Sequence, residues 1–427
     1  MYIHVVSAGE TITDIAKKYN VTIQSIINNN GLINPGNLVV GQSLLILVPD
    51  IVHTVEQVET VYSIAKKYNM TSIEILQNNP AIVHRGWLYA GETIVIKYKI
   101  EKLRQIDVCG FVYAFIRRFL LKAEIPYLTY LILFEYGFNY DGSLIIPEDD
   151  ELVQLAEDFS TGVMLSLTTI DETGIFVEEK TKKLLTDKTL QQTVLNNMLI
   201  VMKQKGAKGM DIDFEYIPPE LKDNYIEFVQ LAADVMHANG YIVNIDLAPK
   251  TSASQAGTLY EAHNYNMLGE IADTVFLMTY EWGHTRGQPM AVAPIDKVRK
   301  VLDYAVTEID PKKMYLGIPN YAYDWALPYV KGKTLAQTLG NTAAIERAVY
   351  YGAEIQFDEK AMTPFYEYTA ENGVKHIVWF EDVRSLQAKF NLINEYGLLG
   401  AGYWSVMRRF PANWMLLNAM YDIRKFD

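Results

Sequence analysis

The chain of 427 residues is longer than one ordinary domain, so we expect at least two domains, one of them with a large core. Half of the residues are hydrophobic and 21% are charged, which is the composition of a globular protein. The formal net charge of −13 argues against a nucleic-acid partner, because neutralising phosphates requires clustered Lys and Arg. No apolar run approaches the roughly 18 residues that a membrane span needs, and the sequence indicates no protein partner.

The N-terminus carries neither a basic stretch nor an apolar stretch long enough for a cleavable signal peptide. If the protein works outside the cytoplasm, we expect it to leave by another route or to be already processed. Cys109, the only cysteine, cannot form an intrachain disulfide. Its apolar neighbours predict a buried strand residue rather than a reactive thiol.

The first part of the chain contains one segment twice. The motif Ile-Ala-Lys-Lys-Tyr-Asn at residues 15–20 recurs 49 residues later, at residues 64–69, and each copy begins near a histidine, His4 or His53. Each copy also contains an Asn pair and ends in a Gly that precedes a short apolar strand. Apolar residues at helical spacing between these points predict strand, helix, helix and strand in each copy.

These shared features closely resemble LysM modules, and we expect the two modules to cover residues 1–48 and 50–97. The resemblance implies binding to N-acetylglucosamine-containing polymers such as peptidoglycan or chitin, between the loop after the first strand and the loop after the second helix. It places Asn29, Asn30 and Asn79 near the sugar. The alternative is that these asparagines are helix caps and turn residues.

Residues 101–427 alternate apolar strands with helical stretches, which predicts the α/β class and a (β/α)8 TIM barrel. The long gap between the last two strands contains Asn372 and Gly373 between β-prone runs, which is a hairpin signal. We therefore expect a small α+β insertion between strands 7 and 8, at about residues 330–385. The eight strands are expected at residues 106–114, 127–135, 162–168, 209–215, 242–248, 274–280, 314–319 and 400–405.

The fourth predicted strand carries three acids at alternate positions, Asp211, Asp213 and Glu215. Strand alternation puts all three on one face, which in a barrel is the interior, and the last acid opens at the carboxyl end, where barrel active sites lie. Burying three carboxylates in a row is too costly for passive structure. Their repulsion raises at least one pKa, as a general acid requires, and Glu215 is the natural acid. The alternative is an edge strand with a solvated acidic face.

Residues 208–215 resemble the family 18 glycoside hydrolase motif Asp-Gly-x-Asp-x-Asp-x-Glu. The resemblance implies that Glu215 is the acid/base, that Asp213 orients and polarises the substrate acetamido group, and that Asp211 supports Asp213. Lys208 stands where the motif has its first Asp. Because that position lies toward the base of the strand, we expect the change to weaken a supporting contact more than the chemistry.

Two further strands agree with this resemblance. The sixth ends in Met278-Thr-Tyr280-Glu281-Trp282, which resembles the family's Met-x-Tyr-Asp with Glu in place of Asp. Tyr280 is then expected to hydrogen-bond the acetamido carbonyl, and Met278, Glu281 and Trp282 to contact substrate. Trp404 of the eighth strand is expected to form the apolar floor under the reacting sugar. The third strand lacks the family's Gly-Gly pair.

The resemblance implies a retaining mechanism in which the substrate's own 2-acetamido oxygen attacks the anomeric carbon. We expect no cofactor and no metal, because the seven His residues show no His-Glu-x-x-His or Cys/His pairing. LysM modules ahead of such a barrel resemble the spore-associated N-acetylglucosaminidases of endospore-forming bacteria. That likeness implies action on cortex peptidoglycan during germination and a location in the spore. A chitinase and a non-hydrolytic chitin- or peptidoglycan-binding lectin are the alternatives.

Overall fold

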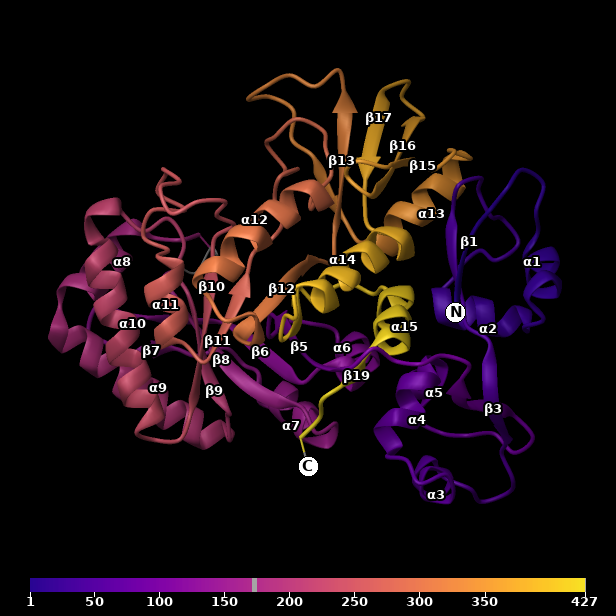
Figure 1. Ribbon diagram of the computed structural model, residues 1–427, viewed down its shortest axis with the longest axis horizontal. Helices are drawn as coiled ribbons and strands as arrows, with labels where there is room; N and C mark the ends of the chain where they lie inside the picture. Colours follow the sequence, from indigo (N-terminus) through magenta and orange to yellow (C-terminus); the bar gives the residue numbers. More distant parts are fainter. Residues whose placement is uncertain (171–174, 427) are drawn as a thin grey trace.

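The computed structural model describes residues 1–170 and 175–426 (Figure 1). Within them, eight parallel strands form a ring in which β18 pairs with β12 on one side and with β5 on the other. The predicted (β/α)8 barrel is therefore confirmed. Its strands are β5 (Gln105–Val112), β6 (Tyr130–Phe138), β8 (Gly162–Thr168), β9 (Gly209–Asp213), β10 (Ile242–Leu247), β11 (Thr274–Leu277), β12 (Met314–Pro319) and β18 (Gly400–Trp404).

Helices surround the ring because the outward side chains of the strands are apolar. Phe214, just after β9, shows the outer packing, since its ring stacks on Phe228 with the centroids 5.6 Å apart. Cys109 is buried in β5, as predicted, and burial raises the pKa of its thiol well above the usual value. The surrounding helices are α6 (Arg118–Glu124), α7 (Asp150–Asp158), α8 (Glu178–Thr186), α9 (Lys188–Lys205), α10 (Lys222–His237), α11 (Tyr265–Ile271), α12 (Ile295–Glu308), α14 (Val383–Glu395) and α15 (Pro411–Met420).

Smaller elements complete the barrel. The strand β7 (Leu144–Ile145) pairs antiparallel with β6, and β19 (Asp422–Ile423) pairs with β5 near the C-terminus. Three short 3-10 helices precede a strand or a helix within the described residues: η1 (Ile125–Tyr127), η2 (Pro219–Leu221) and η3 (Pro311–Lys313).

Between β12 and β18 the chain builds a separate antiparallel sheet, which stands above the barrel in Figure 1. The predicted hairpin is present, because β16 and β17 pair across a turn in which Val374 N donates to Asn372 Oδ1 at 3.0 Å, and Gly373 takes φ +78°. The elements are β13 (Ala322–Leu327), β14 (Gln337–Leu339), α13 (Asn341–Tyr351), β15 (Gln356–Asp358), β16 (Thr363–Thr369) and β17 (Lys375–Trp379).

Each N-terminal repeat has its own small core, built on Ile15 and Ile26 in the first and on Ile64 and Ile75 in the second. The second repeat differs from the predicted two-helix pattern because it contains a third short helix that begins at Pro80, a residue suited to the first helical turn. The elements are β1 (Tyr2–Val5), α1 (Ile12–Tyr19), α2 (Ile23–Asn30) and β2 (Ser43–Ile46), then β3 (Pro49–Thr54), α3 (Val61–Lys67), α4 (Ser72–Asn78), α5 (Pro80–Arg85) and β4 (Thr93–Tyr98).

Both repeats pack against the barrel through α15, which contacts α2 and α4 (Figure 1). Buried polar contacts join the parts: Ser43 Oγ donates to Asp382 Oδ2 at 2.8 Å, and Gln77 Nε2 donates to the carbonyl of Pro126 at 2.8 Å. Such contacts need a fixed geometry, since a buried polar group without its partner costs about 1–3 kcal/mol. The repeats and the barrel therefore form one packed body.

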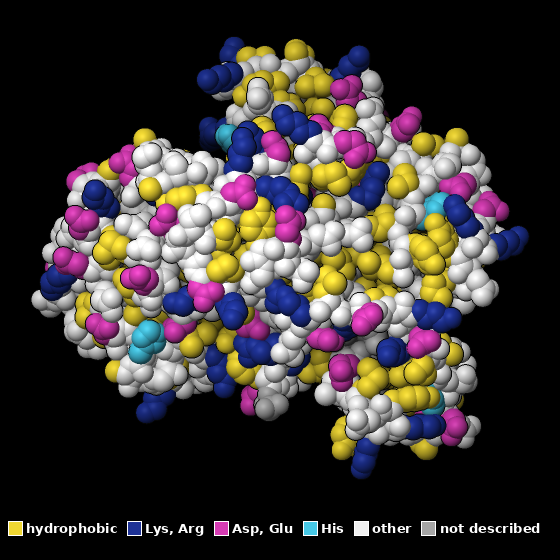
Figure 2. All heavy atoms as spheres, in the orientation of Figure 1, with side chains coloured by type: hydrophobic (Ala, Val, Ile, Leu, Met, Phe, Trp, Pro, Cys, Tyr) yellow, Lys and Arg dark blue, Asp and Glu magenta, His cyan; other side chains and the backbone are white. Residues whose placement is uncertain are grey.

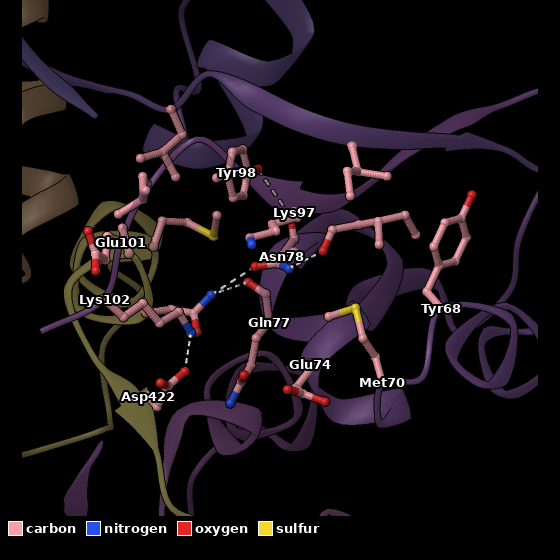
Figure 3. A pocket seen from close by; sticks show the side chains of 17 residues that line it. Tyr68, Met70, Glu74, Gln77, Asn78, Lys97, Tyr98, Glu101, Lys102 and Asp422 are labelled. Atoms are coloured by element: carbon pink, nitrogen blue, oxygen red, sulfur yellow. Dashed lines mark hydrogen bonds and ion pairs between the residues drawn. The ribbon is translucent and has the colours of Figure 1, made fainter. Parts of the chain in front are cut away.

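A cavity of about 580 Å³ lies where the second repeat, the connector and α15 meet (Figure 3). Lys102 crosses it to Asp422, with Nζ and Oδ1 3.1 Å apart, and Tyr98 donates to the carbonyl of Asn78 at 3.1 Å. Its lining includes none of the three acids of the β9 segment. The cavity belongs to the junction between domains.

On the face shown in Figure 2, acidic and basic side chains are interspersed, and neither sign forms an extended area. Among the helices of the described residues, none is long and apolar enough to cross a membrane.

Candidate active site

Three carboxyl groups follow one line up the barrel interior and end at its carboxyl edge. Asp211 and Asp213 lie within β9 and are buried, with 0% and 3% of their surfaces exposed. Glu215 lies two residues beyond the end of β9 and is half-buried, so its carboxyl group opens into the cleft above. The backbone turns sharply at once, because Tyr216 takes φ +54°.

The neighbouring parallel strands place polar side chains around these acids. Register puts Ser166 of β8 and Asn244 of β10 beside Asp211. Asn244 Nδ2 donates to Asp211 Oδ1 at 2.6 Å and also lies 3.3 Å from Oδ1 of Asp246, a fourth buried acid. One amide group therefore connects two carboxyl groups at the base of the array.

Burial is the main cause of raised pKa values in this array. It raises the pKa of Glu215 to about 7, with a further contribution from the charge of Glu281. The pKa of Asp213 is well above its usual value, through burial and then through the charges of Glu215 and Asp211. Burial also raises the pKa of Asp211 to about 6. The array therefore holds protons near neutral pH, which is what a general acid requires.

His263 supports the backbone next to the acid. Its Nδ1 accepts from the backbone N–H of Ala248 at 2.8 Å, which makes Nε2 the protonated nitrogen, and Nε2 lies 3.2 Å from the carbonyl oxygen of Phe214. Burial lowers the pKa of His263 to about 4, so the ring is neutral at physiological pH. This ring ties the end of β10 to the residue before Glu215.

Tyr280 and Glu281 follow β11 and face the same region. Tyr280 is buried, and after burial itself the charges of Asp246, Asp213 and Glu215 raise its pKa, which places its hydroxyl among the acids. Glu281 Oε1 accepts from the hydroxyl groups of Tyr321 at 2.5 Å and Tyr323 at 2.8 Å. Two tyrosines therefore fix the Glu281 carboxylate at the centre of the cleft.

Trp404 ends β18 and packs in an aromatic cluster. Its ring lies 4.9 Å from Phe134, 5.5 Å from Phe111 and 6.0 Å from Tyr113, measured between centroids. Trp404 is only partly buried, so an apolar ring surface remains open to the cleft. Such a surface can stack against the apolar face of a sugar.

The cleft has two lobes that share Glu281. The acid lobe, of about 760 Å³, is lined by Glu215, Met278, Tyr280 and Trp282 among others. The tryptophan lobe, of about 570 Å³, is lined by Trp404, Tyr113, Phe115, Tyr321 and Tyr323 among others. The structure thus brings together all the residues that the sequence predicted for the barrel cleft, apart from the two acids buried beneath it.

The asparagines predicted to bind sugar in the repeats have other contacts. Asn30 Nδ2 donates to the carbonyls of Ile26 and Leu45, and its Oδ1 accepts from Leu45 N. Asn79 makes the matching set of bonds in the second repeat, to the backbone of Ile75 and Val95. Asn29 is buried, and its side chain hydrogen-bonds Tyr98. These contacts are those of the structural alternative, in which the asparagines hold a helix end to a strand.

Lys208, at the position where the motif has Asp, lies at the base of the barrel. Its ammonium group is 5.6 Å from the centroid of the Phe426 ring, near the C-terminus of the described chain. Among the described residues, no group of three or more His, Cys, Asp or Glu side chains is placed to hold a metal ion.

Sequence reasoning did not single out Asn244, Asp246, His263, Tyr321 and Tyr323. A signal for the first two was present, because residues 242–247 alternate Asn and Asp with aliphatic residues, the same period that marked β9. His263 and the two tyrosines had no such signal, since their roles depend on contacts between distant segments.

Comparison with known proteins agrees with this architecture. The model of glycosyl hydrolases family 18 matches residues 117–408, and the LysM domain model matches residues 4–47 and 53–97. The cortical fragment-lytic enzyme of Bacillus subtilis (strain 168) is 41% identical over 428 residues, covering 100% of this chain and 99% of the relative.

Two solved structures resemble the whole chain. The spore cortex-lytic enzyme SleL of Bacillus megaterium QM B1551 is 37% identical with a TM-score of 0.84, covering 99% of this chain and 98% of that one. SleL of Bacillus cereus is 33% identical with a TM-score of 0.83 and the same coverage. The protein therefore belongs to glycosyl hydrolases family 18, carries two LysM domains, and is a glycosidase homologous to spore cortex-lytic enzymes.

Proposed function

We propose that the protein is a retaining, substrate-assisted N-acetylglucosaminidase that cleaves peptidoglycan of the spore cortex during germination. The observation that carries this proposal is the acid series on β9, which ends in a half-buried Glu215 whose pKa is raised to about 7 at the edge of the cleft. The names of the relatives support the cortex as the substrate and the spore as the location.

In the proposed reaction, the acetamido oxygen of the substrate attacks the anomeric carbon while Glu215 donates its proton to the leaving oxygen. Asp213 accepts the acetamido N–H and thereby orients the group, and Tyr280 donates to the acetamido oxygen. Glu215, now a carboxylate, then removes a proton from the water that opens the cyclic intermediate. Buried Asp211 and Asp246 lie next to Asp213, and their raised pKa values keep a proton within this group of acids, which supports this cycle.

Trp404, Met278, Glu281 and Trp282 are proposed to bind the sugars around the cleaved bond. The two LysM domains, at residues 1–48 and 50–97, are proposed to hold the polymer. Asn30 and Asn79 are proposed to shape the ligand loops through the backbone contacts described above, and Asn29 through its contact with Tyr98. The barrel with its insertion, at residues 101–427 and about 330–385, is proposed to act on the polymer so held.

The test is the release of reducing ends from purified spore cortex peptidoglycan by the full-length protein and by Glu215→Gln. Loss of the general acid is expected to lower the rate by at least about 100-fold. Glu220→Gln, an exposed change a few residues further on, is the matched control and should retain wild-type release. Mass spectrometry of the products should show N-acetylglucosamine at the new reducing ends. Equal release by Glu215→Gln and wild type would overturn the proposal.

A further inference from the structure

The position of the cleaved bond in the cleft follows from where the acid opens. Glu215 lines the acid lobe and not the tryptophan lobe, whereas Trp404 lines only the tryptophan lobe. A general acid must lie within hydrogen-bond reach of the oxygen that it protonates. If Glu215 is that acid, as proposed above, the glycosidic oxygen lies within its reach, and the sugars around this oxygen lie near the side chains that line the acid lobe.

The acid lobe also contains cationic side chains. Lys297 and Lys300 lie one helical turn apart near the start of α12, and both line the lobe, together with His284. In the described part of the chain neither lysine has an ion-pair partner within 4.0 Å. Lys297 is half-buried and Lys300 is exposed, so both ammonium groups are accessible to a ligand in the lobe.

In the described part of the chain, the acids of the same lobe form no ion pair with these lysines. Glu215 is protonated for part of the population at neutral pH, since its pKa is about 7. Glu281 is held by the hydroxyl groups of Tyr321 and Tyr323. The lobe therefore contains two ammonium groups that can pair with an anionic group of a ligand, within a protein whose net charge is −13.

The two alternative substrates differ in charge. In chitin every sugar is a neutral N-acetylglucosamine. In peptidoglycan alternate sugars are muramic acids, whose 3-O substituent can carry a carboxylate, either directly on the lactyl group or on an attached peptide. We propose that Lys297 and Lys300 bind this carboxylate and thereby favour an anionic substrate over a neutral one. This inference rests on the proposed function and specifies which substrate the cleft selects.

The test compares kcat/KM of the full-length enzyme on three soluble substrates. These are chitotetraose, an alternating N-acetylglucosamine–muramic acid tetrasaccharide with free lactyl groups, and the same tetrasaccharide bearing peptides. For the double variant Lys297→Met/Lys300→Met, we expect the ratio of anionic to neutral kcat/KM to fall by about 3- to 25-fold, because each partly exposed charge pair contributes up to about fivefold. Lys297→Arg/Lys300→Arg should restore most of the ratio.

Lys203→Met, an exposed change on the outer helix α9, is the matched control and should leave both rates unchanged. For the wild type, added salt should lower kcat/KM on the anionic substrates and not on chitotetraose. A loss confined to one anionic tetrasaccharide would identify which carboxylate is bound. An unchanged ratio in the double variant would overturn the inference. Failure of the proposed function is separate, because it would appear as activity retained by Glu215→Gln.

Discussion

At the residue scale, two causes set the behaviour of the proposed acid. Burial favours the neutral form of Glu215, and the nearby negative charge of Glu281 favours it further. His263 contributes position without charge, because its lowered pKa keeps the ring neutral while it contacts the carbonyl of Phe214. Glu215 therefore supplies the proton and His263 supports the backbone, so the two roles can be tested by separate substitutions.

The pH profile should report this arrangement. With a pKa of about 7, Glu215 is protonated below that pH and ionised above it, so kcat/KM should fall as pH rises through about 7. Glu281→Gln removes the neighbouring negative charge, which favours the ionised form and lowers the pKa of Glu215. The falling limb should therefore move to lower pH, by a fraction of a unit to about one unit. A limb that stays in place or moves upward in Glu281→Gln would contradict this account of the pKa.

At the element scale, two helix ends of the same kind have different surroundings. Gly31 ends α2 with φ +63°, and Gly206 ends α9 with φ +62°. Both glycines avoid the strain that a side chain meets in the left-handed region. Only at Gly31 would an added Cβ meet another residue, because it would lie 2.6 Å from Cγ of Pro411. A Cβ added at Gly206 would meet nothing within 4 Å.

This pair isolates the packing of the first LysM domain on α15. Gly31→Ala and Gly206→Ala should share a backbone cost of about 1 kcal/mol in the free energy of unfolding. Gly31→Ala should cost about 1–3 kcal/mol more, because the added methyl group overpacks the contact with Pro411. Denaturant titration of both variants measures the difference. Equal losses would show that α2 does not pack tightly against α15 in solution.

At the scale of the whole molecule, the LysM domains and the barrel share buried contacts. Tyr127 donates to the carbonyl of Gln77 at 2.9 Å in a buried setting, and Ser43 reaches Asp382 from the first domain. Lys102 and Asp422 join the connector to the C-terminal strand. Removing either LysM domain would therefore expose the face of α15 as well as remove a glycan contact, so point substitutions are the cleaner tests of binding.

Calorimetry should show one cooperative unfolding transition for the full chain. Each small repeat core is too limited to be stable to high temperature alone, so its stability depends on the barrel that it packs against. Gly31→Ala should lower the temperature of that single transition, or separate an early shoulder from it, while Gly206→Ala should shift it less. Two well-resolved transitions in the wild type would show that the domains unfold independently.

Much of the fold and of the candidate site could be predicted from local patterns in the sequence. Period-two alternation predicted the interior acids of β9, the 49-residue recurrence predicted the repeats, and Asn372-Gly373 predicted a hairpin. These features depend on neighbours along the chain, so the sequence by itself determines them. It also predicted the α/β barrel, because alternating strands and helices have few other ways to bury their apolar faces.

Only the tertiary structure decided which distant groups meet. It joined Glu281 to Tyr321 and Tyr323, set His263 beneath Phe214, and turned Asn30 and Asn79 inward to the backbone. It also placed Lys297 and Lys300 in the same lobe as Glu215, although two barrel strands, β10 and β11, separate these lysines from Glu215 in the sequence. Such contacts follow from barrel closure and domain packing, which bring together residues that lie far apart in the sequence. The spacing of these residues along the chain does not indicate their distance in space.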